Sequence, residues 1–164
     1  MKRALIAIVD AAHARLFTYQ QVDENEPTLR ELRELVSPGR QGHDLFSDTK
    51  PGNRWQEGGR GSTDDHRNDH IAELDARFAK QIIAEMCRAV ADENFHHVIL
   101  VASPKMLGEL RRADAPLRRG DIVIDEVPQD LAWLTPPQVH DHLAQMKLID
   151  PRPRAPMTRG ARSR

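Results

Sequence analysis

The residues most suited to chemistry lie in one stretch, QEGGRGSTDDHRNDH, at positions 56–70. Its three glycines, Gly58, Gly59 and Gly61, can adopt positive φ without steric cost, so they favour a narrow bend of the backbone. Arg60 lies between them and offers a fixed cation, which suits contact with phosphate. The stretch therefore predicts a thin loop tip that could contact a nucleic-acid backbone.

Histidines and aspartates follow the glycines and could either bind a metal or start a helix. If a helix has begun by His66, then His66 and His70 lie one turn apart and could share a cation, with Asp69 or Asp65 as a third ligand. Asp64 and Asp65 fit the other interpretation, because carboxylates near a helix N-terminus accept hydrogen bonds from free N–H groups. No H-E-x-x-H motif or cysteine pair accompanies them. We therefore favour helix capping and predict no metal or other cofactor.

A second cluster of candidate binding residues is basic and follows an apolar strand. The sequence SPKMLGELRR places Lys105 in the first turn of a short helix at the carboxyl end of that strand, where sheets of this kind often bind ligands. Only Glu109 and Asp114 oppose the arginines of this region, which are Arg111, Arg112, Arg118 and Arg119. We call Lys105 and these four arginines the basic edge. It could contact RNA phosphates, although a solvated helix face is the other meaning of such a run.

Strand patterns precede these segments. ALIAIV at 4–9 is a continuous apolar run typical of a buried strand, and ARLFTYQ at 14–20 would form a hairpin with it. TLRELRELV at 28–36 is ambiguous, because its leucine spacing favours a helix whereas its position between two prolines fits a third strand. We predict the strand. Residues 38–65 contain six of the nine glycines and predict a long, exposed, glycine-rich loop.

Helices and strands alternate in the second half of the chain. Apolar residues spaced by three and four predict the main helix from His66 to Asp92; they are Ile71, Leu74, Phe78, Ile82, Met86 and Val90. Residues 96–103 and 121–127 predict strands, and helices are expected from Pro104 and from near Thr135. The order β-β-β-α-β-α-β-α predicts an α/β domain with a five-stranded mixed sheet and flanking helices, the topology of ribonuclease H-like domains.

Catalytic constellations are incomplete in this sequence. Two-metal phosphodiester cleavage on such a sheet needs carboxylates from the first strand, the first helix and the fourth strand. Asp10 could serve on the first strand and Glu73 or Asp75 on the helix, but HHVILVAS at 96–103 supplies no acid. Asp10 is therefore interpreted as a turn residue, and Cys87, among apolar positions, as a packing residue. Two further histidine pairs are interpreted as surface or strand-edge residues: His96 with His97, and His140 with His142.

Composition is ordinary for a soluble globular protein. The chain has 164 residues, of which 39% are hydrophobic and 30% charged, enough for one domain with its own core. A single cysteine cannot form an internal disulfide, and the longest apolar runs are too short to span a bilayer. The apolar run near the start is shorter than the core of a secretory signal. We therefore expect a cytoplasmic protein that does not enter a membrane.

Charge is distributed unevenly between the body of the protein and its C-terminus. The formal net charge is −1, but residues 151–164 hold five arginines and no acid, which leaves 19 basic and 25 acidic groups in the preceding 150 residues. With three prolines and little to bury, this end is expected to be disordered. We predict one domain at 1–147 and a disordered Arg/Pro-rich tail at 148–164. The tail could bind phosphates or an acidic partner, or act only as a solubilising end.

Four segments together carry a family resemblance. They are IAIVDAAHARLFTY, the GGRG loop before the long helix, VILVASPKMLGELR and VPQDLAWLTPPQV. Over roughly residues 1–145, the sequence resembles the bacterial host attachment protein family, proteins required for attachment to host cells. That family is similar to the middle domain of archaeal and eukaryotic peptide-chain release factors. There, a Gly-Gly-Gln loop precedes the long helix and enters the peptidyl transferase centre of the ribosome.

The resemblance implies a release-factor-like domain without the catalytic glutamine. Gly58 and Gly59 match the two glycines, but Arg60 stands where the glutamine would organise the attacking water. This favours a non-enzymatic protein that associates with the ribosome, tRNA or other RNA through the glycine-rich loop and the basic edge. Two alternatives stay open: a protein-interaction factor that influences attachment without an RNA role, and a metal-dependent hydrolase that uses His66 and His70. The sequence does not give the partner or the oligomeric state.

Overall fold

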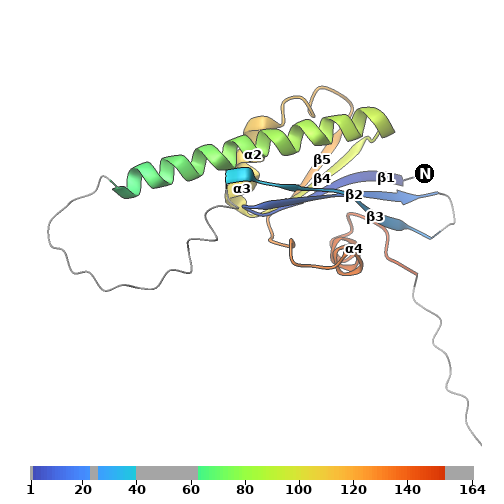
Figure 1. The fold of residues 1–164 in the computed structure, drawn as a ribbon. Helices are drawn as coiled ribbons and strands as arrows, with labels where there is room; N and C mark the ends of the chain where they lie inside the picture. The colour runs from blue at the N-terminus through green and yellow to red at the C-terminus, as the bar shows by residue number, and fades with distance from the viewer. Residues whose placement is uncertain (1, 23–25, 40–62, 154–164) are drawn as a thin grey trace, which may run out of the picture.

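Five strands form one mixed sheet in the computed structural model, which describes residues 2–22, 26–39 and 63–153 (Figure 1). The strands are β1 (Lys2–Val9), β2 (His13–Gln21), β3 (Thr28–Val36), β4 (His97–Ala102) and β5 (Val123–Val127). Their order is β3-β2-β1-β4-β5, with β2 antiparallel to both neighbours and β4 and β5 parallel to the central β1. The ambiguous third segment is therefore a strand, as predicted.

Three helices cover the two faces of the sheet. They are α2 (Thr63–Glu93), α3 (Pro104–Ala113) and α4 (Pro136–Gln145). Helices α2 and α3 lie on one face, and α4 lies on the other (Figure 1). The element order and strand order confirm the predicted α/β domain with ribonuclease H-like topology. Helix α2 begins three residues earlier than predicted, and most of the predicted glycine-rich loop, residues 40–62, lies outside the described residues.

The apolar stripe of α2 packs on the sheet as its spacing predicts. Phe78, Ile82 and Met86 are at most 2% exposed and belong to one cluster with side chains of β1 and β4. The same cluster includes α3 through Met106 and Leu110. Because the middle of the stripe is fully buried while its two ends are only partly covered, the stability of this layer depends mainly on those three α2 side chains.

A second core lies between the sheet and α4. Phe17 and Tyr19 of β2 meet Val139 and Leu143 of α4, each at most 2% exposed. The central strand contributes to both cores, because successive side chains of a strand point to opposite faces. Ile6, for example, faces α4 and its neighbour Leu5 faces α2. A continuous apolar run in β1 is therefore the expected pattern for a strand covered on both sides.

The carboxyl end of β1 is closed by the predicted turn residue. One carboxylate oxygen of Asp10 accepts hydrogen bonds from the backbone N–H groups of Ala12, at 2.7 Å, and His13, at 2.6 Å. This is an Asx-type turn that links β1 to β2. The interpretation of Asp10 as a turn residue is confirmed.

The ordered body continues past the predicted boundary at residue 147. Ile149 is 7% exposed within the α4-side core, and Asp150 is bonded to Lys2 and Tyr19. Arg152 then pairs with Asp141 of α4. The boundary was therefore placed too early. Charge and proline content do not reveal that residues 148–150, which follow α4, pack against β1 and β2. The remainder of the predicted tail, residues 154–164, lies outside the described residues.

Candidate nucleic-acid interface

Helix α2 projects beyond the sheet at its N-terminal end, on the side where β1 and β4 terminate (Figure 1). Residues 66–70 are all exposed, and from residue 66 onward the first buried residue of the helix is Asp75. The first turns of α2 therefore form an arm with little contact to the body. In the sequence, the arm follows directly on the predicted loop tip, Gly58, Gly59, Arg60 and Gly61, which lies outside the described residues.

Lys105 lies at the base of this arm. Its Nζ is 3.2 Å from the carboxylate of Asp75, whose side chain is only 4% exposed, whereas the Lys105 side chain is 67% exposed. A nearly buried carboxylate needs a cation or hydrogen-bond donors to remain charged. Lys105 is in the first turn of α3, as predicted, and its ion pair with Asp75 links α3 to α2.

Carboxylates accompany most of the basic edge. Arg112 Nη1 is 2.7 Å from Glu109, and Arg118 Nε is 2.8 Å from Asp114. Arg111 Nε is 2.8 Å from Glu126, which lies on β5. Glu126 raises the pKa of Arg111 through this hydrogen bond and its charge, and Asp114 does the same for Arg118. Arg119 is exposed at the end of the edge.

The basic edge therefore carries much less net charge than its sequence suggests. Each of its cations except Arg119 has a carboxylate within ion-pair distance among the described residues. The arginines nevertheless remain half or more exposed, and exposed ion pairs contribute about 0 to 1 kcal/mol. A phosphate could replace a carboxylate partner at little cost, but long-range attraction of a polyanion would be weak.

The candidate metal ligands lie on the arm and do not converge with further ligands in the part of the chain that is described. His66, His70 and Asp69 are exposed, and no group of three histidine, cysteine or acidic side chains suited to a metal occurs among residues 2–22, 26–39 and 63–153. The two helix acids considered for nuclease chemistry are also engaged elsewhere. Glu73 pairs with Arg77, and Asp75 pairs with Lys105.

One of the histidines assigned to the surface is buried. His140 is 2% exposed, its Nε2–H donates to the backbone carbonyl of Asp150 at 2.8 Å, and its ring meets Tyr19 edge-on. The surface prediction for His140 is therefore wrong, because the segment after α4 folds back over it. His96 is exposed as expected, whereas His142 is half-buried and His97 is half-buried beside Asp125.

An exposed aromatic side chain that follows the carboxyl end of β5 was not predicted. Trp133 is 76% exposed in the connection between β5 and α4, although its neighbours Leu131 and Leu134 are buried. Arg15 Nη1 donates to the carbonyls of Ala132 at 3.2 Å and Leu134 at 2.7 Å, on either side of the tryptophan. The Trp133 loop, residues 131–134, is thus held to β2 while its indole faces solvent.

Arg15 itself is anchored by its own partners. It forms a two-point ion pair with Glu31 of β3, at 3.1 and 2.9 Å, and its guanidinium lies 5.0 Å from the centroid of the Phe17 ring. The hydrogen bonds that Arg15 donates to Glu31 raise the pKa of Arg15. The sequence could have indicated this anchoring. Arg15 and His13 are the only acidic or basic side chains of β2, which is mostly buried, and a charge in such a strand requires partners.

The topology and these surfaces define a ribonuclease H-like α/β domain with an exposed helical arm. Residues 5–143 match the family described as "Protein required for attachment to host cells", so the chain belongs to that family. The resemblance to the host attachment family is confirmed, and the match includes at least part of every described strand and of α2, α3 and α4. No curated protein sequence gave a significant match. In the part of the chain that the structure describes, no helix is both long and apolar enough to cross a membrane.

Solved structures similar to this chain are distant. The Ppx/GppA phosphatase of Aquifex aeolicus, in its type II variant, is 14% identical with a TM-score of 0.37, over 77% of this chain and 36% of the phosphatase. This chain therefore spans about a third of the length of that protein. RuvC of Thermus thermophilus is 12% identical with a TM-score of 0.41, over 93% of this chain and 84% of RuvC. Likenesses of this size say nothing about activity.

Proposed function

We propose that this member of the host attachment family is a non-enzymatic, release-factor-like domain of the cytoplasm that associates with the ribosome or tRNA. The observation that supports the proposal best is the exposed arm of α2. It extends beyond the rest of the body by about two helical turns, and in the sequence it comes just after the Gly58–Gly61 segment. A loop at the end of such an arm could enter a recess that the body of the domain cannot.

Arg60 supplies the contact that we expect at the tip. In a release factor this position is a glutamine that organises water for hydrolysis, whereas an arginine presents planar donors that match phosphate geometry. The domain would therefore occupy an RNA cavity without cleaving an ester. The basic edge has a secondary role here, because its cations must exchange carboxylate partners for phosphates.

Replacing Arg60 by alanine is expected to reduce co-sedimentation with ribosomes by at least about tenfold, since one charge-assisted, two-point contact is worth about 1.5 to 3 kcal/mol. Binding to an unstructured single-stranded RNA should change little, because that contact needs a shaped receptor. Lys80→Ala, an exposed cation farther along α2, is the matched control and should leave both unchanged. Wild-type protein that fails to sediment with ribosomes and fails to bind tRNA would refute the proposal.

A second candidate function is supported by the Trp133 loop. Exposed tryptophans on rigid backbone are typical of the energetic centres of protein interfaces. The charged side chains that hydrogen-bond to this loop are Arg15, which is already paired with Glu31, and Asp130, so they offer little to a phosphate. These features favour a protein partner and a role in attachment without RNA.

Replacing Trp133 by alanine should change the free energy of unfolding by less than about 0.5 kcal/mol, because the side chain is mostly exposed. If the Trp133 loop is a protein interface, complexes cross-linked in cells should contain contacts at residues 131–134 in the wild type. These contacts should disappear in Trp133→Ala and persist in Trp133→Phe. An unchanged set of cross-linked partners in Trp133→Ala would argue against this second function.

A further inference from the structure

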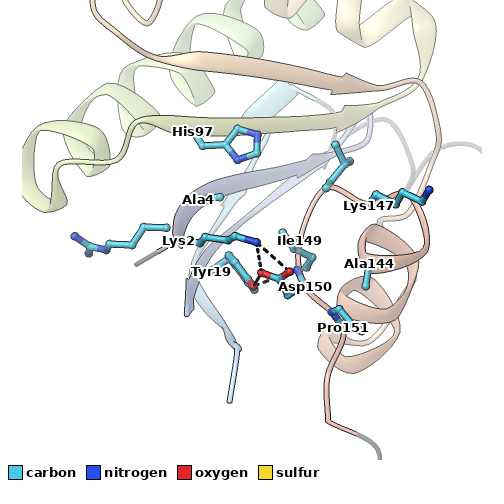
Figure 2. A pocket seen from close by; sticks show the side chains of 11 residues that line it. Lys2, Ala4, Tyr19, His97, Ala144, Lys147, Ile149, Asp150 and Pro151 are labelled. Carbon is cyan, nitrogen blue, oxygen red and sulfur yellow. Dashed lines mark hydrogen bonds and ion pairs between the residues drawn. The ribbon is translucent and has the colours of Figure 1, made fainter. Parts of the chain in front are cut away.

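A cavity of about 430 Å³ lies at the amino ends of β1 and β4, on the α4 face of the sheet and opposite the edge that carries the arm (Figure 2). One wall is formed by the strand residues Lys2, Tyr19 and His97, and the other by the segment that follows α4, residues 147–151. Its volume lies within the range of small-molecule sites in proteins. None of the residues discussed as the nucleic-acid interface lines it.

The floor of the cavity is a fixed polar network. Lys2 Nζ contacts both carboxylate oxygens of Asp150, at 3.1 and 2.9 Å. The Tyr19 hydroxyl donates to the same carboxylate at 3.3 Å and accepts from the Asp150 N–H at 3.2 Å. These contacts hold the pKa of Asp150 below its usual range, with the Lys2 hydrogen bond as the largest cause. The acid of this cavity is therefore charged and already neutralised by a cation.

The other basic side chains of the lining are Arg3, His97 and Lys147. Arg3 pairs with Glu93 and lies over the Phe95 ring, and His97 Nε2 lies 2.7 Å from Asp125 on β5. Lys147 lies at the rim with its ammonium in solvent, and no carboxylate lies within ion-pair distance of it among the described residues (Figure 2). The lining thus has a surplus of positive charge, which would favour an anionic ligand.

The backbone of Lys147 has an unusual conformation for a lysine. Its φ is 60°, and the N–H groups of Lys147 and Leu148 bond back to Ala144 and Leu143, which is the glycine-type end of a helix. Glycine adopts this conformation without strain, and asparagine tolerates it. The other described non-glycine residue with positive φ is indeed an asparagine, Asn94. A lysine here has a conformational cost that no ion pair within the described structure offsets.

We infer that this cavity binds a small organic anion whose carboxylate or phosphate is held by Lys147 and Lys2. The four-carbon side chain of Lys147 can turn from solvent across the rim, and His97 faces the cavity from the opposite wall (Figure 2). The apolar part of the ligand would lie against Ala4, Ala144 and Ile149. The ligand compensates for the strained lysine, which explains why glycine does not occupy this position.

Calorimetric titration with matched probes tests this inference. Phenyl phosphate and phenylacetate carry the two candidate headgroups, phenylacetamide is the uncharged analogue, and inorganic phosphate lacks the apolar part. At least one of the two aromatic anions should bind at least about tenfold more tightly than phenylacetamide, and its binding should shift the imidazole NMR signals of His97. Comparison of phenyl phosphate with phenylacetate identifies the headgroup, and inorganic phosphate shows whether the apolar part contributes.

Lys147→Gly separates the proposed role from a structural one. Removing the strained lysine should raise the melting temperature by about 2 to 4 °C while weakening binding of the anion at least about fivefold. Lys80→Gln, which removes an exposed lysine on α2, should change neither. The inference is overturned if neither aromatic anion binds at millimolar concentration, if the His97 signals do not move, or if Lys147→Gly binds as tightly as the wild type.

Discussion

Replacing Phe78 by alanine is expected to destabilise the protein by about 3 to 5 kcal/mol. Phe78 is 2% exposed in the middle of the α2 stripe and shares its cluster with residues of β1 and β4. Truncation loses the transfer free energy of the buried ring. It also leaves a cavity that cannot collapse, because the sheet next to it is packed on both faces. Urea unfolding of the purified protein, followed by far-UV circular dichroism, measures the change.

Two further variants define the meaning of that result. Phe78→Leu retains most of the apolar volume and should cost roughly half as much or less. Lys80→Ala, two residues away and exposed, should stay within about 0.5 kcal/mol of the wild type. A loss below about 1 kcal/mol in Phe78→Ala would contradict the packing of α2 on the sheet.

Replacing Arg15 by methionine is expected to cost about 2 to 4 kcal/mol. The side chain is 16% exposed, and the substitution removes the two-point ion pair with Glu31 and two hydrogen bonds to backbone carbonyls of the Trp133 loop. Hydrogen bonds to charged groups contribute about 1.5 to 3 kcal/mol, and the stem of methionine replaces only the apolar contacts of the arginine. Arg15→Lys should recover only part of the loss, because lysine cannot form the same fork.

The same substitution should release the Trp133 loop. In a Trp55→Phe background, fluorescence of Trp133 reports this loop alone, since the chain has two tryptophans. We expect faster amide exchange at residues 132–134 and a lower fluorescence anisotropy in Arg15→Met. Glu31→Gln, which removes the carboxylate charge but leaves the carbonyl contacts of Arg15 in place, should affect the loop much less. Equal exchange in Arg15→Met and wild type would contradict the anchoring role of Arg15.

Periodicity predicted most of the fold because it reports how each element is buried. The spacing of Phe78, Ile82 and Met86 identified the face of α2 that packs on the sheet, and the unbroken apolar run of β1 identified a strand covered on both sides. The segment 28–36 was ambiguous for a physical reason. It is an edge strand exposed along most of its length, so little burial shapes its sequence, and only its pairing with β2 decides its structure.

The surfaces were harder to predict because they depend on residues that are distant in sequence. Arg111 was assigned to a basic edge, but Glu126 joins it from the neighbouring strand and compensates its charge. His140 was assigned to the surface, and it becomes buried only because Asp150 returns over it. The positive φ of Lys147 has no signature in the sequence, since glycine would be the expected residue there. Pairing across elements, rather than local pattern, determined each of these features.

The position of β1 at the centre of the sheet has a consequence for synthesis of the chain. Its antiparallel partner β2 follows directly in the sequence and can form a hairpin early. Its parallel partner β4 is distant in sequence, as the pairing of Leu5 with Val98 shows, and can pair only later. One edge of a strand that is apolar from residue 4 to residue 9 therefore stays unpaired until residue 102 has left the ribosome and α2 has crossed the sheet. Nascent or truncated chains that end before β4 should be the most prone to aggregate.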